Sequence, residues 1–79
     1  MYVLTTIIRL LKLMIIKTKN STYEICDKLV RNVFGKDNDC IGKDFVKYDL
    51  LFSEPEIGKS LVIMLGDTVI RTSVVIAIN

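Results

Sequence analysis

The 79-residue chain contains no histidine, no tryptophan and only one proline. Without histidine it cannot form the Ser-His or Cys-His pairs of nucleophilic catalysis, so acid–base chemistry would fall to carboxylates, lysine or tyrosine. The carboxylates stand in segments that the sequence predicts as turns or helix ends, where such groups are solvated. We therefore predict a protein that is not an enzyme and that carries no cofactor.

Cysteine is scarce as well, since Cys26 and Cys40 are the two that the chain has. One pair is too few for the disulfide framework of a small secreted domain. Without histidine, the pair also cannot complete an ordinary zinc site. We interpret both as free thiols in a reducing compartment. The sequence thus favours a cytoplasmic protein, inside the host cell if the protein is viral, with no metal site.

A long uninterrupted apolar run is also missing, because Arg9 and Lys12 interrupt the apolar residues 1–16. A membrane-spanning helix needs about 20 consecutive apolar residues, and a signal peptide needs a basic start and a small-residue cleavage site. We expect neither in this chain. Its length allows a single domain, residues 1–79, whose small core a homodimer or a bound partner could complete.

The net charge is only +2, but it is unevenly distributed. Residues 1–36 carry seven basic and two acidic side chains, a net of +5, whereas residues 37–79 carry four basic and seven acidic ones, a net of −3. Such asymmetry can orient a partner. It also leaves weak, non-specific nucleic-acid binding open, with five candidate contacts in the basic half: Lys12, Lys17, Lys19, Lys28 and Arg31.

Residues 2–17 combine two patterns. Thr5, Arg9 and Lys12 would share one side of a helix, which indicates an amphipathic helix. However, the segment is rich in β-branched residues, which lose rotamer freedom in a helix and pack well on a pleated sheet. We favour a long strand and keep the helix as the alternative.

Residues 22–34 give the clearest helix pattern. Ser21 and Glu24 have the spacing of a capping box, and Gly35 stands where helices commonly end. Opposite charges also recur at helical spacing, as in Glu24 and Lys28. An apolar stripe completes the pattern: Cys26, Leu29, Val30, Val33 and Phe34.

The remaining sequence predicts strands. Residues 45–52 form one, and Pro55 marks a connection because proline cannot donate a hydrogen bond to a neighbouring strand. Residues 61–65 and 68–78 surround a two-residue Gly-Asp turn, which is typical of an antiparallel hairpin. We expect the buried face of this hairpin to contain Val62, Met64, Val69 and Val74.

Two short motifs resemble ligand sites but lack necessary parts. The G-K-S sequence at residues 58–60 matches the end of a phosphate-binding loop, but Ser53 stands where the first glycine is needed. Asp37 and Asp39 match positions of a calcium-binding loop, but Tyr48 stands where a bidentate glutamate is needed. We predict a glycine turn and a solvated acidic turn at these places.

The sequences P-E-I-G-K-S-L at residues 55–61 and I-R-T-S-V-V at residues 70–75 resemble the ending of small uncharacterised proteins of phages and other mobile elements. The sequence S-T-Y-E-I at residues 21–25 extends the resemblance loosely, although such proteins tend to continue with Gly-Asp. If it holds throughout, the resemblance implies turn and strand at residues 21–34 and a small β-barrel overall. It implies no functional residues.

From these patterns we predict an α+β fold, with a small antiparallel β-sheet or barrel of about four or five strands and one helix at about residues 22–34. An all-β small barrel is the alternative. For function, we predict a non-enzymatic small binding protein of phage or mobile-element type, an inhibitor of a host enzyme or defence nuclease by protein–protein contact. A nucleic-acid-binding small β-barrel and a structural subunit of a virion or complex are the alternatives.

Overall fold

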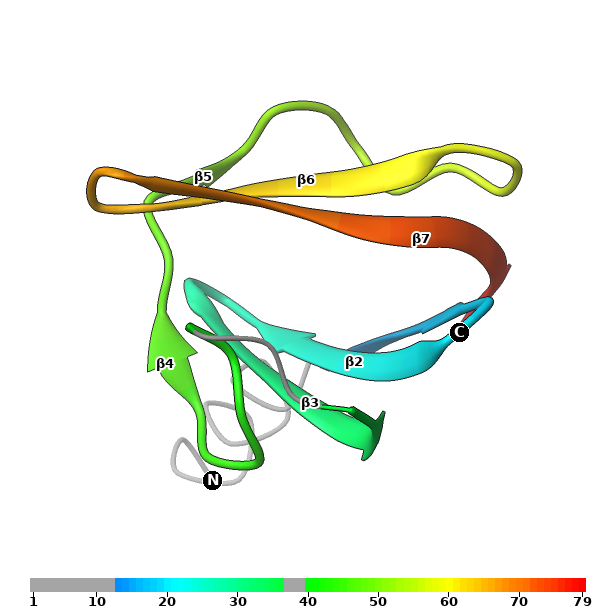
Figure 1. Ribbon diagram of the computed structural model, residues 1–79, viewed down its shortest axis with the longest axis horizontal. Helices are drawn as coiled ribbons and strands as arrows, with labels where there is room; N and C mark the ends of the chain where they lie inside the picture. The colour runs from blue at the N-terminus through cyan, green and yellow to red at the C-terminus, as the bar shows by residue number, and fades with distance from the viewer. Residues whose placement is uncertain (1–12, 37–39) are drawn as a thin grey trace, which may run out of the picture.

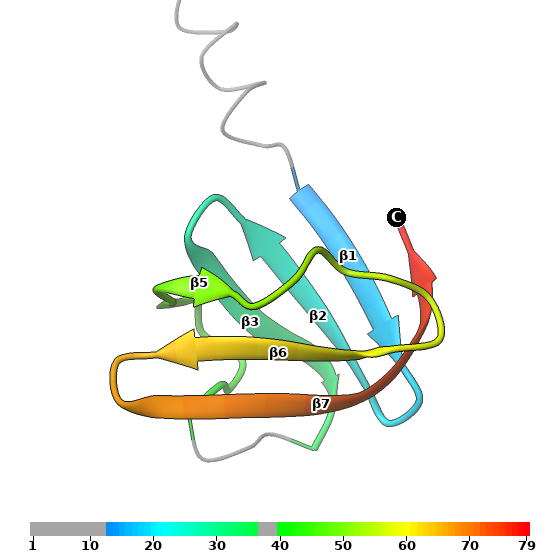
Figure 2. The same cartoon turned by 90° about the horizontal axis from the view of Figure 1, so that it is seen from above.

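The computed structural model describes residues 13–36 and 40–79, and every regular element among them is a β-strand (Figures 1 and 2). All neighbouring strands run antiparallel, in the order β4-β3-β2-β1-β7-β6-β5. The sheet curls into half a barrel, with a concave face and an outward face. The strands are β1 (Leu13–Thr18), β2 (Ser21–Cys26), β3 (Leu29–Gly35), β4 (Val46–Lys47), β5 (Leu50–Leu51), β6 (Ser60–Leu65) and β7 (Thr68–Ile78).

The structure contradicts the predicted helix at residues 22–34, and with it the α+β class, because the described part of the chain is all β. Strands β2 and β3 occupy this segment and are joined by a turn at Asp27 and Lys28. Asp27 has a φ of 54°, a left-handed conformation that Asp adopts more readily than most residues. Gly35, expected to end the helix, ends β3 with a φ of 101°. The all-β alternative has the observed class.

Side-chain alternation explains why this segment is extended. In β2, Ser21, Tyr23 and Ile25 are buried, while the residues between them face outward, which is the period of two that a strand imposes. Glu24 and Arg31 stand directly opposite each other across β2 and β3. The charges that suggested a helix therefore form a cross-strand pair, which stabilises a hairpin in the same way.

The strand predicted at residues 45–52 is present as two shorter strands, β4 and β5, because the chain turns a corner between them. At this corner the amide of Tyr48 donates to the carbonyl of Lys28 in the β2–β3 turn, at 2.8 Å. The amide of Asp49 donates to the carbonyl of Met64 in β6, also at 2.8 Å. The corner thus connects the β2–β3 turn, in one half of the sheet, to β6 in the other half.

The strand predicted at residues 2–17 is present from Leu13 onward as β1, and its earlier part lies outside the described residues. The described structure has seven strands, more than predicted. The excess arises because the expected helix is two strands and the expected strand at residues 45–52 is divided.

The predicted C-terminal hairpin is confirmed, since β6 and β7 pair antiparallel around the Gly-Asp turn. The predicted buried face of this hairpin is wrong. Val69 and Val74 are 53% and 41% exposed, whereas Leu61, Ile63 and Val75 are buried. Both faces of the two strands are apolar, and a shift of one residue exchanges the faces. The sequence pattern alone therefore could not select the buried one.

The core fills the concave face of the sheet. Each fully buried aliphatic side chain stabilises the fold by about 1.5–3 kcal/mol, and the two halves of the sheet contribute together. The buried apolar residues are Ile16, Tyr23, Ile25, Val30, Ile41, Tyr48, Leu61, Ile63 and Val75.

A β-bulge bends the sheet where β1 meets β7, since their register shifts between Lys17 and Thr18. Such an extra residue increases the local bend and twist of a strand. Thr18 is buried there, and its Oγ1 accepts hydrogen bonds from the Ser21 amide at 3.0 Å and from Ser73 Oγ at 2.9 Å. These bonds attach the β1–β2 turn to β7 and fix the curvature.

Candidate functional site

The five basic residues considered for nucleic-acid binding do not form one patch among the described residues. Lys12 lies outside them. Lys17 and Lys19 are exposed at the β1–β2 end of the sheet, and Lys28 is exposed in the turn at the opposite end of β2. A strand of six residues separates these two ends by about 20 Å. Arg31 lies on β3 between these two ends, and its guanidinium already interacts with neighbouring side chains.

Arg31 is held by two neighbours on the outward face. Its Nε donates to Oε1 of Glu24 at 2.8 Å, and its Nη2 lies 2.8 Å from the same oxygen. The guanidinium also stacks on Phe45, with Cζ 4.7 Å from the ring centroid, which is within cation–π range. A phosphate would have to displace these contacts, so the arrangement favours a structural role for Arg31.

Lys28 takes part in a cluster at the β4–β5 corner. Its Nζ donates to the carbonyl of Asp49 at 2.9 Å and lies 5.6 Å from the Tyr48 ring centroid. The Tyr48 hydroxyl donates to the carbonyl of Asp27 at 2.8 Å. Burial raises the pKa of Tyr48, and the nearby Asp27 charge raises this pKa further. The phenol therefore remains protonated and acts as a structural donor.

The structure bears on the phosphate-loop motif but not on the two aspartates of the calcium-loop motif. Gly58, with a φ of 94°, precedes strand β6, so no helix N-terminus is available there to bind phosphate. Lys59 Nζ lies 3.1 Å from Glu56 Oε2 in an exposed ion pair. Asp37 and Asp39 lie outside the described residues. Among the described residues, no three His, Cys, Asp or Glu side chains come together as a metal site would require.

The structure also bears on the predictions about the two cysteines and about membrane-spanning helices. Cys26 and Cys40 are half-buried, and no disulfide joins them. Within residues 13–36 and 40–79, no helix has the length and apolar character needed to cross a membrane.

An apolar surface covers the outward side of the C-terminal hairpin and β5. Leu50, Met64 and Val69 are successive cross-strand neighbours on β5, β6 and β7, and directly opposite residues share a face. Arg71, opposite Val62, is the charged residue among them. We call this surface the hairpin outer face, and define it as Leu50, Val62, Met64, Val69, Arg71, Val74 and Ile76.

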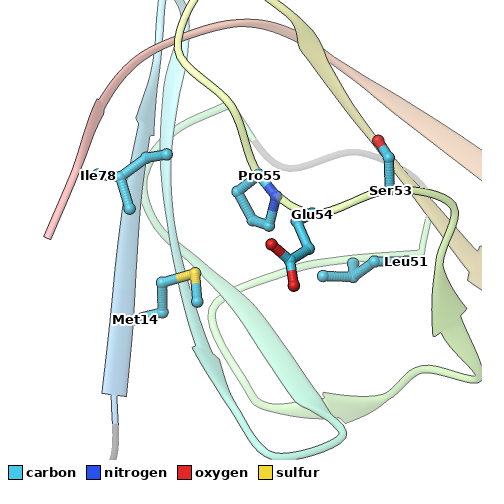
Figure 3. Close-up of a pocket in the computed structure, with 6 residues that line it drawn as sticks. All are labelled: Met14, Leu51, Ser53, Glu54, Pro55 and Ile78. Carbon is cyan, nitrogen blue, oxygen red and sulfur yellow. The ribbon is translucent and has the colours of Figure 1, made fainter.

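A cleft of about 580 Å³ opens on the concave side of the sheet. Its wall includes Met14 and Leu51, which are paired with the buried Ile25 and Ile63 and therefore face inward. In Figure 3 the carboxylate of Glu54 is turned toward the space between Met14 and Leu51. We call this feature the β7 cleft, and define it by its lining residues: Met14, Leu51, Ser53, Glu54, Pro55 and Ile78.

The main chain of β7 is half-paired beside this cleft. Ile15 and Asn79 exchange two backbone hydrogen bonds, of 3.1 and 2.8 Å. In an antiparallel ladder the next residue points its N–H and C=O in the opposite direction, so those of Ile78 point away from β1. On that side, the last bonds of β7 among the described residues are those of Val75 with Gly58 and Lys59.

A second hollow, of about 430 Å³, lies on the outward face of β1, β2 and β3. Leu13, Cys26 and Leu29 are successive cross-strand neighbours there. Phe45 and Arg31 complete its wall. Both charges at this place, those of Arg31 and Glu24, are already paired with each other, so the hollow offers a mainly apolar surface.

Comparison of the chain with protein families, curated proteins and solved structures gives no match. The resemblance to phage proteins therefore stays a prediction, and the site must be interpreted from its own geometry.

Sequence reasoning assigned four residues of the hairpin outer face to the core and missed the β7 cleft. These four are Val62, Met64, Val69 and Val74. For the outer face a signal exists, because residues 61–65 are apolar without interruption, a pattern typical of strands covered on both faces. For the cleft no comparable signal exists. Its residues come from β1, β5, the following connection and β7, and only the curl of the sheet brings these together.

Proposed function

We propose that this protein is a non-enzymatic binding protein that covers part of the surface of a protein partner with its hairpin outer face. The observation that carries this proposal is the exposure of apolar side chains on that face. Val69 is 53% exposed, Ile76 49% and Val74 41%. A sheet face that stays in water normally carries polar side chains, and contiguous exposed apolar patches mark interaction surfaces.

The composition of the face indicates what kind of partner fits. Arg71 is exposed and stands among valine, methionine and isoleucine side chains, with Val62 opposite it. Arginine surrounded by apolar residues is typical of the energetically important centre of protein interfaces. A complementary partner would present an apolar patch with a carboxylate placed to receive the guanidinium.

The finer proposal follows from the phage-type ending of the sequence. An inhibitor of a host enzyme or defence nuclease, acting in the host cytoplasm, needs no catalytic group of its own. It needs a rigid surface that blocks its target. The bulge and the hydrogen bonds of Thr18 with Ser21 and Ser73 support such rigidity at the centre of the sheet.

The proposal is tested by replacing Val69 with a photo-crosslinking amino acid, capturing the partner and purifying it. The dissociation constant is then measured by calorimetry for the wild type, Val69→Asp and Ile76→Asp. A carboxylate in the centre of an apolar interface is desolvated without a partner, so we expect at least about a tenfold loss of affinity. Phe34→Asp is the matched control, because Phe34 is 72% exposed on β3, outside the face, and should leave affinity unchanged.

Two results would count against this function. One is an unchanged affinity of both hairpin variants for the purified partner. The other is a concentration-dependent dimer in sedimentation velocity that Val69→Asp dissociates, since the face would then be covered by a second copy of the chain.

A further inference from the structure

The β7 cleft combines an apolar wall with polar groups that have no partner among the described residues. The wall is formed by Met14, Leu51, Pro55 and Ile78. The Glu54 carboxylate has no ion-pair partner within residues 13–36 and 40–79, unlike Glu24, which is paired with Arg31, and Glu56, which is paired with Lys59. The volume of the cleft, about 580 Å³, is within the range of ligand sites in proteins.

The backbone beside the cleft provides a second kind of unused group. The N–H and C=O of Ile78 point away from β1 and have no bonding partner within residues 13–36 and 40–79. A strand edge with unpaired main-chain groups is a template for a further extended chain. Peptides that bind in this way gain affinity from main-chain bonds and specificity from pockets for alternate side chains.

We propose that the β7 cleft binds an extended segment of a partner protein in which a lysine or arginine is flanked by aliphatic residues. The segment pairs with the free edge of β7 at Ile78 and places aliphatic side chains against Met14 and Leu51. Its basic side chain reaches the carboxylate of Glu54. The lone carboxylate in an apolar cleft selects a cation, and the free strand edge selects an extended peptide over a compact small molecule.

This inference rests on the proposed function only in that the occupant belongs to a protein. The cleft opens on the concave side of the sheet, whereas the hairpin outer face lies on the opposite side, as the pairing of Leu51 with the buried Ile63 indicates. The proposals for the β7 cleft and for the hairpin outer face can therefore be tested independently of each other.

The test begins with a displayed library of random short peptides selected against the full 79-residue chain. We expect enriched sequences in which aliphatic residues alternate around one Lys or Arg. A selected peptide, labelled for fluorescence anisotropy, should bind the Glu54→Gln variant roughly two- to fivefold more weakly than the wild type. A loss of this size corresponds to the contribution of one exposed ion pair. Glu54→Lys should weaken it further, because like charges then face each other.

Glu56→Gln is the matched control, because Glu56 is an exposed carboxylate two positions away that is paired with Lys59 and does not line the cleft. It should leave the affinity unchanged. In nuclear magnetic resonance spectra, the peptide should shift the Ile78 amide and the Met14 methyl signals. Rising salt should weaken binding to the wild type more than binding to Glu54→Gln.

Three results would overturn the inference: selected peptides without a basic residue, equal affinity for the wild type and both Glu54 variants, or shifts centred on Val69 and Arg71. The last would assign the peptide to the hairpin outer face and so support the proposed function while removing the cleft. Conversely, peptide binding that Val69→Asp leaves intact, together with unchanged partner affinity in that variant, would keep the cleft and remove the proposed function.

Discussion

Tyr48 is the residue that joins the β2–β3 turn to the corner between β4 and β5. Its amide donates a hydrogen bond to the backbone carbonyl of Lys28, and its hydroxyl donates one to the backbone carbonyl of Asp27. Its ring is buried, and the Lys28 ammonium lies over it. A phenol in this position must stay protonated, because ionisation would remove the donor and place a negative charge close to Asp27.

The first prediction concerns the pH dependence of stability. Burial, and then the Asp27 charge, raise the pKa of Tyr48 above its ordinary value of 10.0, so the folded state binds this proton more tightly than the unfolded state. The stability from Tyr48 is therefore complete below about pH 10 and falls as pH rises beyond it. Urea unfolding from pH 8 to 11 should show a steeper decline for the wild type than for Tyr48→Phe. Parallel curves for the two proteins would contradict the assignment.

The second prediction concerns the pair that the sequence left ambiguous. In a helix Glu24 would face Lys28, whereas in the observed hairpin it faces Arg31. A double-mutant cycle on Glu24→Ala and Arg31→Ala should give a coupling energy of about 0.2–1 kcal/mol. The same cycle on Glu24 and Lys28, its internal control, should give a value near zero. A reversal of these two results would restore the helix.

At the scale of elements, the β2–β3 segment explains why sequence reasoning chose the wrong structure. Ser21, Glu24 and Gly35 stand at helical spacing, and the same residues suit a strand start, a cross-strand pair and a left-handed strand end. Local sequence patterns alone could not distinguish a helix from a β-hairpin in this segment. The choice depends on pairing with β1 and β4, whose contributions come from distant parts of the chain. The hairpin of β6 and β7 was predictable because its turn and both of its strands are contiguous.

The third prediction tests which face of that hairpin is buried. Val75 is 1% exposed and Val69 is 53% exposed. Val75→Asp places an unpaired carboxylate in the core, a cost that a domain of this size cannot offset, so this variant should be unfolded. Val69→Asp should keep the wild-type melting temperature within a few degrees, because exposed substitutions usually change stability by about 0.5 kcal/mol or less. Circular dichroism melting and amide dispersion measure both.

The opposite outcome, an unfolded Val69→Asp and a folded Val75→Asp, would mean that the register of β7 is shifted by one residue. The hairpin outer face would then be the core, and the proposed binding surface would not exist. The pair of variants therefore tests the fold and the basis of the function together.

At the scale of the whole molecule, the half-barrel has apolar side chains on both of its faces. One face builds the core, and the other leaves Leu50, Val69 and Ile76 in water. The composition indicated no place where a partner would bind, because the location of such a site depends on the curled sheet. The cleft shows this most clearly, since Met14 and Ile78 are 64 positions apart in the chain and become neighbours only through the β1–β7 pairing.

The last prediction separates protein binding from nucleic-acid binding through salt. Lys17 and Lys19 lie at one end of β2 and Lys28 at the other, while Arg31 is paired with Glu24. Few of these charges can contact one backbone at once, and each contact contributes about −0.7 to −0.9 to the slope of log affinity against log salt. Fluorescence anisotropy with single- and double-stranded oligonucleotides should therefore give a slope shallower than about −2 and dissociation constants on the order of tens of micromolar or weaker near physiological salt.

The double variant Lys17→Gln/Lys19→Gln should flatten this slope further, and Lys28→Gln should change it less, because Lys28 lies alone at the opposite end of β2 from that pair. Submicromolar binding with a slope of several units would require many phosphate contacts on one surface. The candidate residues Lys17, Lys19, Lys28 and Arg31 provide no such surface, so that result would contradict this arrangement of contacts and make nucleic acid, rather than protein, the leading partner.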